Sequence, residues 1–382
     1  MKRRADGRTG GRAALIWMAV LCLTVCPSAR LPAQDSQFGI QGLGTPGKQE
    51  SVRARSAGGA FAPFDAFSPL MDAALADVRR LSAGVTNGTS WRNIPAPPPD
   101  SSETTLRTTR FPALVLAGPI LPRLTVGGGF ATYLDRSYGI TTEDTIDIRG
   151  NPEPVRDEIK SDGGVTDVRL AAGFRMGRRL AVGAGIHLLT GSSRIVATRR
   201  FADSTNYRSS TSRDEIAYQG LGASFSALLD LGRDLRVAGW YRADSKLRAD
   251  LNGRTVAEND LPTSYGGGVL WSPGGQAVIA GSVAWRTWST AGASVNAHDT
   301  FNWSFGAEIG SASSPIRVGA RGGQLPFGIN GAPTEIGYSA GLGRQFAAGR
   351  GRLDIGVERL ERKGTGLTEP VWTLLLGVTV RP

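Results

Sequence analysis

Four arginines in the second half of the chain are the residues best suited to bind an anion. A guanidinium can hold a carboxylate through two parallel hydrogen bonds, most effectively where water is excluded. By alternation along their segments, Arg236, Arg242, Arg317 and Arg321 lie on the polar face. That face also carries acids, which are Glu308, Glu335, Asp354 and Glu358. The arginines could therefore hold a ligand carboxylate or pair with these acids, and the similar numbers of both signs favour pairing.

Other residues capable of chemistry do not form a catalytic or cofactor site. The chain has 2 His and 2 Cys, which makes a metal site built from these residues improbable. His187 and His298 have no convincing serine partner, and no Gly-x-Ser-x-Gly motif is present. Residues 42–47 match G-x-G-x-x-G, but no strand precedes them and Pro46 interrupts them. We therefore expect no enzyme, no metal and no cofactor.

Charged segments outside these positions also have simple interpretations. The polar stretch 134–162 is rich in carboxylates but lacks the spacing of a calcium loop, so we expect a solvated external loop. No stripe of Lys and Arg with interleaved aromatic residues is present, which argues against nucleic acid as a partner.

The first 33 residues have the layout of a secretory signal peptide. A basic start precedes an apolar run over residues 13–26, which is shorter than the roughly 20 residues of a spanning helix, and a small residue, Ala33, follows. The alternative is a cytosolic protein with a basic tail. Removing the segment takes away six basic residues and one acidic residue, so the formal net charge falls from +11 to +6. Both cysteines, Cys22 and Cys26, leave with it, so no disulfide is expected.

The rest of the chain alternates between apolar and polar residues with a period of two, which indicates strands. In 335–346, for example, Ile336, Tyr338 and Leu342 alternate with Gly337, Ser339 and Gly343. Fourteen such segments are predicted: 81–92, 105–118, 123–133, 163–176, 178–199, 213–230, 233–247, 263–272, 276–288, 299–310, 315–323, 335–347, 351–362 and 370–381.

The connections between these segments alternate between short and long. Short periplasmic turns and longer external loops are typical of an up-and-down antiparallel barrel in an outer membrane, with strands that are apolar outside and polar inside. We therefore predict an all-β, transmembrane barrel of about 14 strands over residues 81–382. Residues 34–80 do not alternate, and 72–80 suggest a short helix with acid first and base last. Since the barrel has interior room, we predict that 34–80 form a plug inside it.

Short motifs along the chain resemble the FadL-like family of outer-membrane long-chain fatty-acid transporters. The N-terminal part is similar to the hatch of that family at Gly58, Gly59 and Ala60, and again where Asp72 opens an Asp-Ala-Ala-Leu run. Met71 and Asp72 stand where the family has Asn and Pro. The C-terminal half is similar at residues 261–273, 285–289, 307–308, 317–319, 325–327, 334–335 and 341–343. The chain ends on Val-Arg-Pro rather than on an aromatic residue.

The resemblance implies a function. The family takes up hydrophobic molecules and releases them sideways beside a kinked third strand, where this chain has Gly127, Gly128 and Gly129. These glycines could instead make room for the plug. We expect a monomeric outer-membrane transporter that contacts lipid and binds a hydrophobic small molecule such as a long-chain fatty acid. The alternatives are an accessory barrel of a secretion or assembly system and a general porin.

Overall fold

The computed structural model describes residues 36–68, 70–95, 103–274, 276–364 and 366–381. The predicted signal peptide, residues 1–33, lies outside this part of the chain. Among the described residues no helix has the length and apolar content needed to cross a bilayer.

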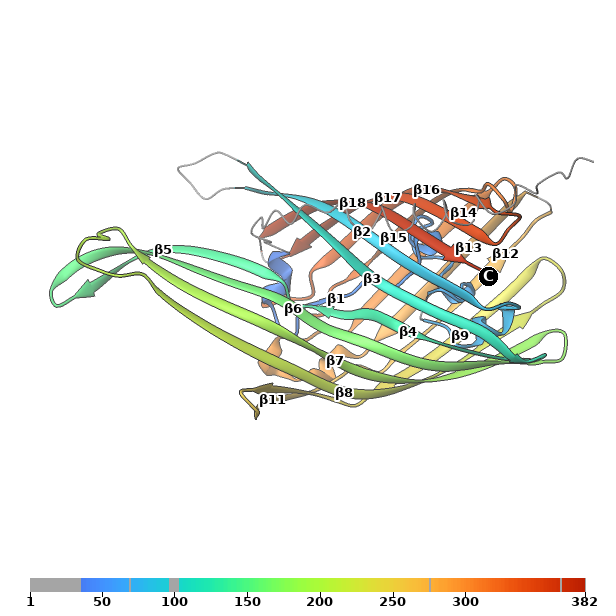
Figure 1. Ribbon diagram of the computed structural model, residues 1–382, viewed down its shortest axis with the longest axis horizontal. Helices are drawn as coiled ribbons and strands as arrows, with labels where there is room; N and C mark the ends of the chain where they lie inside the picture. The colour runs from blue at the N-terminus through green and yellow to red at the C-terminus, as the bar shows by residue number, and fades with distance from the viewer. Residues whose placement is uncertain (1–35, 69, 96–102, 275, 365, 382) are drawn as a thin grey trace, which may run out of the picture. The chain divides into compact units, whose positions relative to one another are not determined.

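Fourteen antiparallel strands form a closed barrel over the described residues (Figure 1). Strand β18 pairs with β2, and β9 pairs with β12, so the wall has no open edge. The wall strands are β2 (Ser82–Pro95), β3 (Glu103–Leu121), β4 (Leu124–Asp135), β6 (Asn151–Met176), β7 (Leu180–Phe201), β8 (Ser210–Asp230), β9 (Leu235–Asp244), β12 (Ser264–Trp271), β13 (Ala277–Arg286), β14 (Thr300–Ile309), β15 (Ile316–Gln324), β16 (Thr334–Phe346), β17 (Gly351–Gly364) and β18 (Leu367–Val380). The predicted fold class is confirmed.

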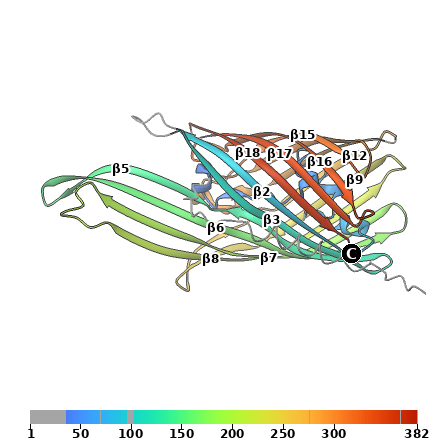
Figure 2. The ribbon, with the colours of Figure 1, turned by 45° about the horizontal axis from the view of Figure 1, so that its top comes forward.

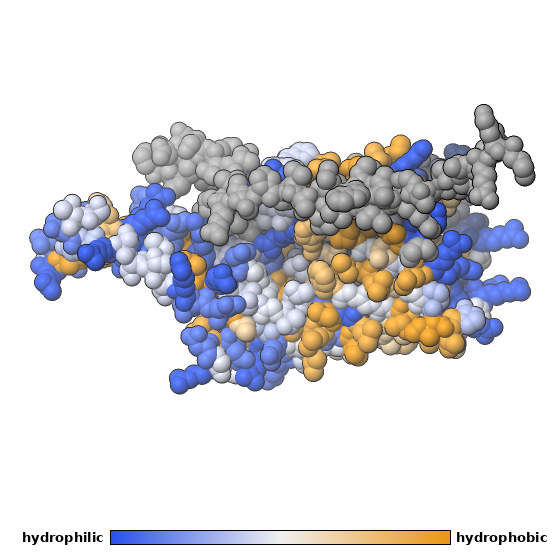
Figure 3. Space-filling model, in the orientation of Figure 1, coloured by the Kyte–Doolittle hydropathy of each residue, from blue (hydrophilic) through white to orange (hydrophobic). Residues whose placement is uncertain are grey.

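The alternating sequence explains which face of each strand lies outside. Along β16, Ile336, Tyr338 and Leu342 are exposed, whereas Glu335 and Ser339 are buried. Apolar side chains gather over the middle of the wall and hydrophilic ones at its ends (Figure 3). Because lipid tails accept apolar side chains and offer no hydrogen bonds, this band is the surface that a membrane barrel presents.

Two predicted loops are strands instead. The stretch 134–162 contains β5 (Tyr138–Ile148) and the first part of β6. The predicted connection 247–262 contains β11 (Arg254–Asp260) and all but the first residue of β10 (Lys246–Leu251). Both turns bring two consecutive residues to positive φ, at Arg149 with Gly150 and at Asn252 with Gly253, as a tight hairpin requires. Most side chains of these hairpins are exposed or half-buried on both faces, with exceptions such as the buried Leu247 and Val155, so the hairpins lack the apolar alternation that reveals the wall strands.

The first hairpin lengthens one side of the barrel. In Figures 1 and 2, β5 and the adjoining parts of β6, β7 and β8 continue past the ends of the strands from β12 to β18. Pairing follows β6 and β7 out to Val155 and Phe201, so the extension is regular sheet.

Residues 36–80 form short elements that pack against the inner face of the wall. They comprise η1 (Gln37–Ile40), β1 (Thr45–Pro46), α2 (Val52–Arg55), η2 (Ala62–Phe64) and η3 (Ala73–Asp77). Helix α2 contacts β16, β17 and β18, η2 contacts β9 and β12, and η3 contacts β4, β6, β7 and β8. The short helix predicted at 72–80 is the 3-10 helix η3. We refer to residues 36–80 as the N-terminal segment.

Glycines in the wall let this segment approach closely. A Cβ atom at Gly319 would lie 2.1 Å from the carbonyl carbon of Ala57, and one at Gly183 would lie 2.3 Å from the amide nitrogen of Ala73. Real Cβ atoms do not approach other heavy atoms so closely, so the backbone of the segment occupies the space that side chains would fill elsewhere. Apolar residues then complete the contact, since Phe61, Met71 and Leu75 are fully buried.

Candidate functional site

Several regions of open space lie against the N-terminal segment, at both ends of the barrel. A cavity of about 510 Å³ is lined by Arg79, Gly349 and Arg381, so it lies toward the end of the barrel where the short turns are. Two smaller adjoining cavities, of about 90 and 120 Å³, share Glu50, Trp240 and Arg286. They lie toward the end that carries the long connections. We call this adjoining pair the upper cavity.

The upper cavity combines aromatic walls with a few polar groups. Trp240, Trp288 and Tyr133 line it together with Leu70 of the N-terminal segment. Trp288 is 2 % exposed and packs edge-on against Phe327, with ring centroids 5.2 Å apart. Such a mixture of apolar surface and sparse polar groups is characteristic of sites for small hydrophobic molecules.

Several donors at the upper cavity lack a described acceptor. Trp288 Nε1 and Arg242 Nη2 are buried without a hydrogen-bond partner in the described part of the chain. Arg286 donates to Asn302 Oδ1 at 3.3 Å and has no described carboxylate within 4.0 Å. Glu50 Oε2, an acceptor, is also buried without a partner among these residues. Because an unsatisfied buried polar group is costly, these atoms mark where a ligand or water would be held.

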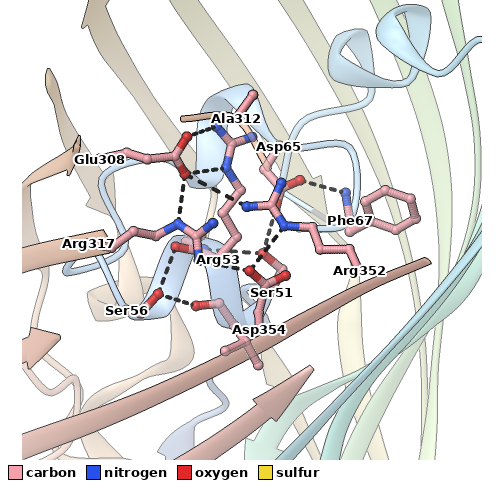
Figure 4. A network of polar contacts seen from close by, with 12 residues as sticks. Ser51, Arg53, Ser56, Asp65, Phe67, Glu308, Ala312, Arg317, Arg352 and Asp354 are labelled. Atoms are coloured by element: carbon pink, nitrogen blue, oxygen red, sulfur yellow. Dashed lines mark hydrogen bonds and ion pairs between the residues drawn. The ribbon is translucent and has the colours of Figure 1, made fainter. Parts of the chain in front are cut away.

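The four arginines chosen from the sequence are all paired with carboxylates. Arg317 donates to Glu308 at 2.7 Å and to Asp354 at 2.8 Å (Figure 4). Arg53 of the N-terminal segment reaches the same Glu308 at 3.1 Å, and Arg352 reaches Asp354 at the same distance. This cluster therefore ties α2 to the wall, and Arg317 faces carboxylates rather than the upper cavity.

Arg321 belongs to a second cluster of the same kind. It pairs with Glu358, which also binds Arg55 of α2, and it lies 3.8 Å from Glu335. Lys48 of the N-terminal segment pairs with Glu335. Burial lowers the pKa of the Lys48 ammonium and the charge of Arg321 lowers it further, while Glu335 acts in the opposite direction.

The other two arginines lie on β9. Arg236 pairs with Asp230 and with Asp77 of η3, both at 2.6 Å. Arg242 pairs with Asp167 at 2.6 Å and with Asp244 at 2.8 Å. Of the four predicted residues, Arg242 and Arg321 line the upper cavity. Arg286 was not predicted from the sequence. It could have been found as a basic residue on the polar face of β13 that has no acidic residue opposite it on β14.

The residues predicted for the hatch lie at contacts with the wall. Gly58 and Gly59 have φ of 69° and 90°, which lets the chain turn out of α2, and the Gly58 amide donates to Ser339 Oγ at 2.8 Å. Ala60 is fully buried. Asp72 accepts hydrogen bonds from Arg169 of β6 at 2.9 Å and from Ser224 of β8 at 2.6 Å.

The predicted gate glycines lie within a continuously paired strand. Gly127, Gly128 and Gly129 are in register with β3 and also with β6, and the register shift falls beyond them, between Thr132 and Leu134. A Cβ atom at Gly127 would lie 2.8 Å from Leu75 Cδ2. Gly127 therefore makes room for the side chain of Leu75 in η3, and the role of the three glycines as a gate stays a prediction.

The structure also assembles a serine, a histidine and a carboxylate that the sequence analysis did not connect. Nδ1 of His187 lies 2.9 Å from Asp167 Oδ1, and its Nε2 lies 2.8 Å from Ser224 Oγ. Pairing of β6 with β7 and of β7 with β8 brings these three residues together. Predicting their contact from the sequence would have required the register of both hairpins. The Ser224 hydroxyl contacts Asp72, a better acceptor than imidazole, which disfavours a nucleophilic role. His298 contacts the carbonyl oxygen of Gly328 at 2.9 Å, as suits a loop residue.

The described residues contain no group of His, Cys, Asp and Glu side chains placed to hold a metal ion. No family model matches the sequence, and no curated protein sequence matches it.

Solved structures do match. The chain is similar to the CymD monoaromatic hydrocarbon channel, with 15 % identity, a TM-score of 0.55, and coverage of 89 % of this chain and 98 % of that one. It is also similar to a Pseudomonas aeruginosa FadL homologue, with 14 % identity, a TM-score of 0.59, and coverage of 88 % of this chain and 99 % of that one. For the Ralstonia pickettii toluene transporter TbuX, the identity is 13 %, the TM-score is 0.55, and the coverage is 90 % of this chain and 99 % of that one. The chain therefore has the fold of the FadL-type channels for hydrophobic compounds, a fold of outer-membrane barrels.

Proposed function

We propose that this protein takes up hydrophobic small molecules across the outer membrane, and that long-chain fatty acids are among its ligands. The observation that carries the proposal is the upper cavity, where aromatic walls meet the unsatisfied donors of Arg242 and Trp288 and the guanidinium of Arg286, whose described hydrogen-bond partner is the neutral Asn302. The printed names of the similar structures, which include a hydrocarbon channel and a toluene transporter, agree with a hydrophobic ligand.

Binding would combine two contributions. Each methylene group transferred from water to an apolar site contributes about 0.8 kcal/mol, so the aliphatic or aromatic part of the ligand supplies most of the affinity. A carboxylate would be recognised by Arg286, because its only described partner is a neutral amide oxygen 3.3 Å away. Arg236, Arg317 and Arg321, which already hold carboxylates, would serve the structure instead.

The N-terminal segment would act as the hatch of a monomeric transporter. It contacts strands on different sides of the barrel, from β4 to β9, at β12, and from β16 to β18. A general porin is not favoured, because this segment occupies interior space that a diffusion channel needs. Release would require Leu75 to leave its place against Gly127, opening a path beside β4 into the lipid.

The proposal can be tested by binding measurements on the purified protein in detergent micelles. Trp240 and Trp288 line the upper cavity, so tryptophan fluorescence should respond to ligand. Oleate and oleyl alcohol make a matched pair of probes that differ in charge and share the chain. In Arg286→Met, oleate affinity should fall roughly tenfold, which corresponds to about 1.4 kcal/mol, while oleyl alcohol affinity should stay the same.

The matched control is Arg248→Met, since Arg248 lies in β10 and pairs with Asp250 outside the barrel wall. It should leave both affinities unchanged. If neither oleate nor oleyl alcohol binds the unmodified protein, the uptake proposal fails. If both probes bind and Arg286→Met changes neither affinity, the proposal of a hydrophobic site stands and the proposed contact between Arg286 and the ligand carboxylate is wrong.

A further inference from the structure

A continuous row of polar contacts joins the N-terminal segment to the upper cavity. It starts at Asp72, which accepts from Ser224 at 2.6 Å. Ser224 meets His187 Nε2 at 2.8 Å, and His187 Nδ1 meets Asp167 at 2.9 Å. Asp167 in turn accepts from Arg242 at 2.6 Å. His187 and Asp167 are 2 % and 1 % exposed, yet His187, Ser224 and Arg242 also line the upper cavity.

Counting protons along this row determines the charge of the histidine. A serine hydroxyl has one proton to donate, and at 2.6 Å from the Asp72 carboxylate that proton is engaged there. The contact between Ser224 and His187 therefore needs a proton on Nε2. The contact with the Asp167 carboxylate needs a proton on Nδ1 as well. With both aspartates ionised, His187 carries both protons and is a cation.

The charges around His187 lead to the same conclusion independently. Strands β6, β8 and β9 and the N-terminal segment pack around it, with the hydroxyl of Tyr133 on β4 donating to Asp244. The cluster contains three carboxylates and two guanidinium groups, which are Asp72, Asp167, Asp244, Arg169 and Arg242. Across the cavity, Glu50 and Arg286 contribute one charge of each sign. A protonated His187 makes the cluster electrically neutral, and buried charges are stable only when balanced.

We propose that His187 is a proton-dependent latch that holds the N-terminal segment closed and regulates the proposed uptake site. When His187 gives its Nε2 proton to water in the upper cavity, the bare nitrogen becomes an acceptor. The Ser224 hydroxyl then turns to His187 and leaves Asp72, which keeps only Arg169. The uncompensated negative charge and the lost hydrogen bond weaken the hold on η3. Closure is favoured at lower pH and opening at higher pH.

The protonation state can be read directly by NMR. Selective ¹⁵N labelling of histidine in the full chain gives resonances from only His187 and His298, and His298→Gln assigns them. Both ring nitrogens of His187 should be protonated at low pH and one should lose its proton on raising the pH. A ring that is neutral throughout pH 5 to 9, the span around which histidines ordinarily change charge, would overturn the proposal, as would one cationic throughout.

The consequence for the segment can be read by hydrogen exchange. After correction for the intrinsic pH dependence, amides of η3 should lose protection at least fivefold across the same pH interval as the His187 resonances change. His187→Gln and Ser224→Ala should abolish this pH step, whereas His298→Gln should keep it. A step that persists in both His187→Gln and Ser224→Ala would refute the latch. These readouts involve no ligand, so they can succeed or fail independently of the binding measurements that test the uptake proposal.

Discussion

At the residue scale, the interior charges of this barrel are arranged as shared clusters rather than as isolated pairs. Glu308 and Glu358 each receive an arginine from α2 and an arginine from β15. One carboxylate therefore fixes two elements that are distant in sequence. The outer face of the wall is apolar, so charged pairing is concentrated in the interior. These interior clusters therefore specify the position of the N-terminal segment.

Removing one member of such a cluster should be costly. Arg317 is fully buried and contacts Glu308 and Asp354, so Arg317→Ala would leave two carboxylates short of a partner. Breaking a buried ion pair typically costs about 3 kcal/mol or more. We expect the free energy of unfolding in detergent, measured by urea titration, to fall by that amount. Arg248→Ala, which removes an exposed pair with Asp250, should change it by less than about 1 kcal/mol. Equal effects would show that the buried cluster contributes no special stability.

The sequence predicts which charged residues face inward but not which ones meet. Alternation placed Arg236, Arg242, Arg317 and Arg321 on the polar face, and the structure finds each of them there against carboxylates. Their partners include Asp77 and, through shared acids, Arg53 and Arg55, all in a segment without periodicity. Arg286 and the row through His187 depend on strand register, which alternation does not specify.

At the element scale, glycine positions decide how closely the N-terminal segment can dock. In Gly319→Ala, the new Cβ atom would overlap the backbone of Ala57 at 2.1 Å, whereas the strand itself can accept alanine. The barrel should still fold, but α2 should be displaced. Limited proteolysis should cut within residues 36–80 several times faster than in the unmodified protein. Gly239→Ala in β9, where a Cβ atom would meet nothing within 4 Å, should leave the cleavage rate unchanged.

Elements with one lipid-facing side were predictable, and elements in water were not. All fourteen wall strands follow from apolar alternation, because the membrane demands it. The hairpins β5–β6 and β10–β11 were not predicted, because polar and β-branched residues predominate there and most side chains are exposed or half-buried on both faces. The hairpin β10–β11 does carry a strong sequence signal for a tight turn, the Asn252-Gly253 pair, and could have been predicted from it.

At the scale of the whole molecule, the question is how a ligand leaves a barrel whose wall is closed. Strand pairing encircles the described barrel without interruption, including at β3, β4 and β6 around the glycines. A lateral path would therefore require β4 to move away from a neighbouring strand. An axial path would instead lead to the 510 Å³ cavity near the short turns, which is lined by arginines such as Arg79 and Arg381.

A disulfide across β3 and β4 tests whether a lateral path opens between these two strands. Leu114 and Phe130 are cross-strand partners on the outer face beside the glycines, and the chain after residue 33 contains no cysteine that would interfere. If release is lateral through an opening between β3 and β4, the oxidised Leu114→Cys/Phe130→Cys variant should lose most of its fatty-acid uptake in cells, and a reductant should restore it. The control joins Ala340 to Val357, partners on the outer face of β16 and β17, and should transport normally in both states. Full uptake with the β3–β4 link oxidised would exclude an opening between β3 and β4, because that seam is locked, and would leave the axial path or a separation of β4 from β6.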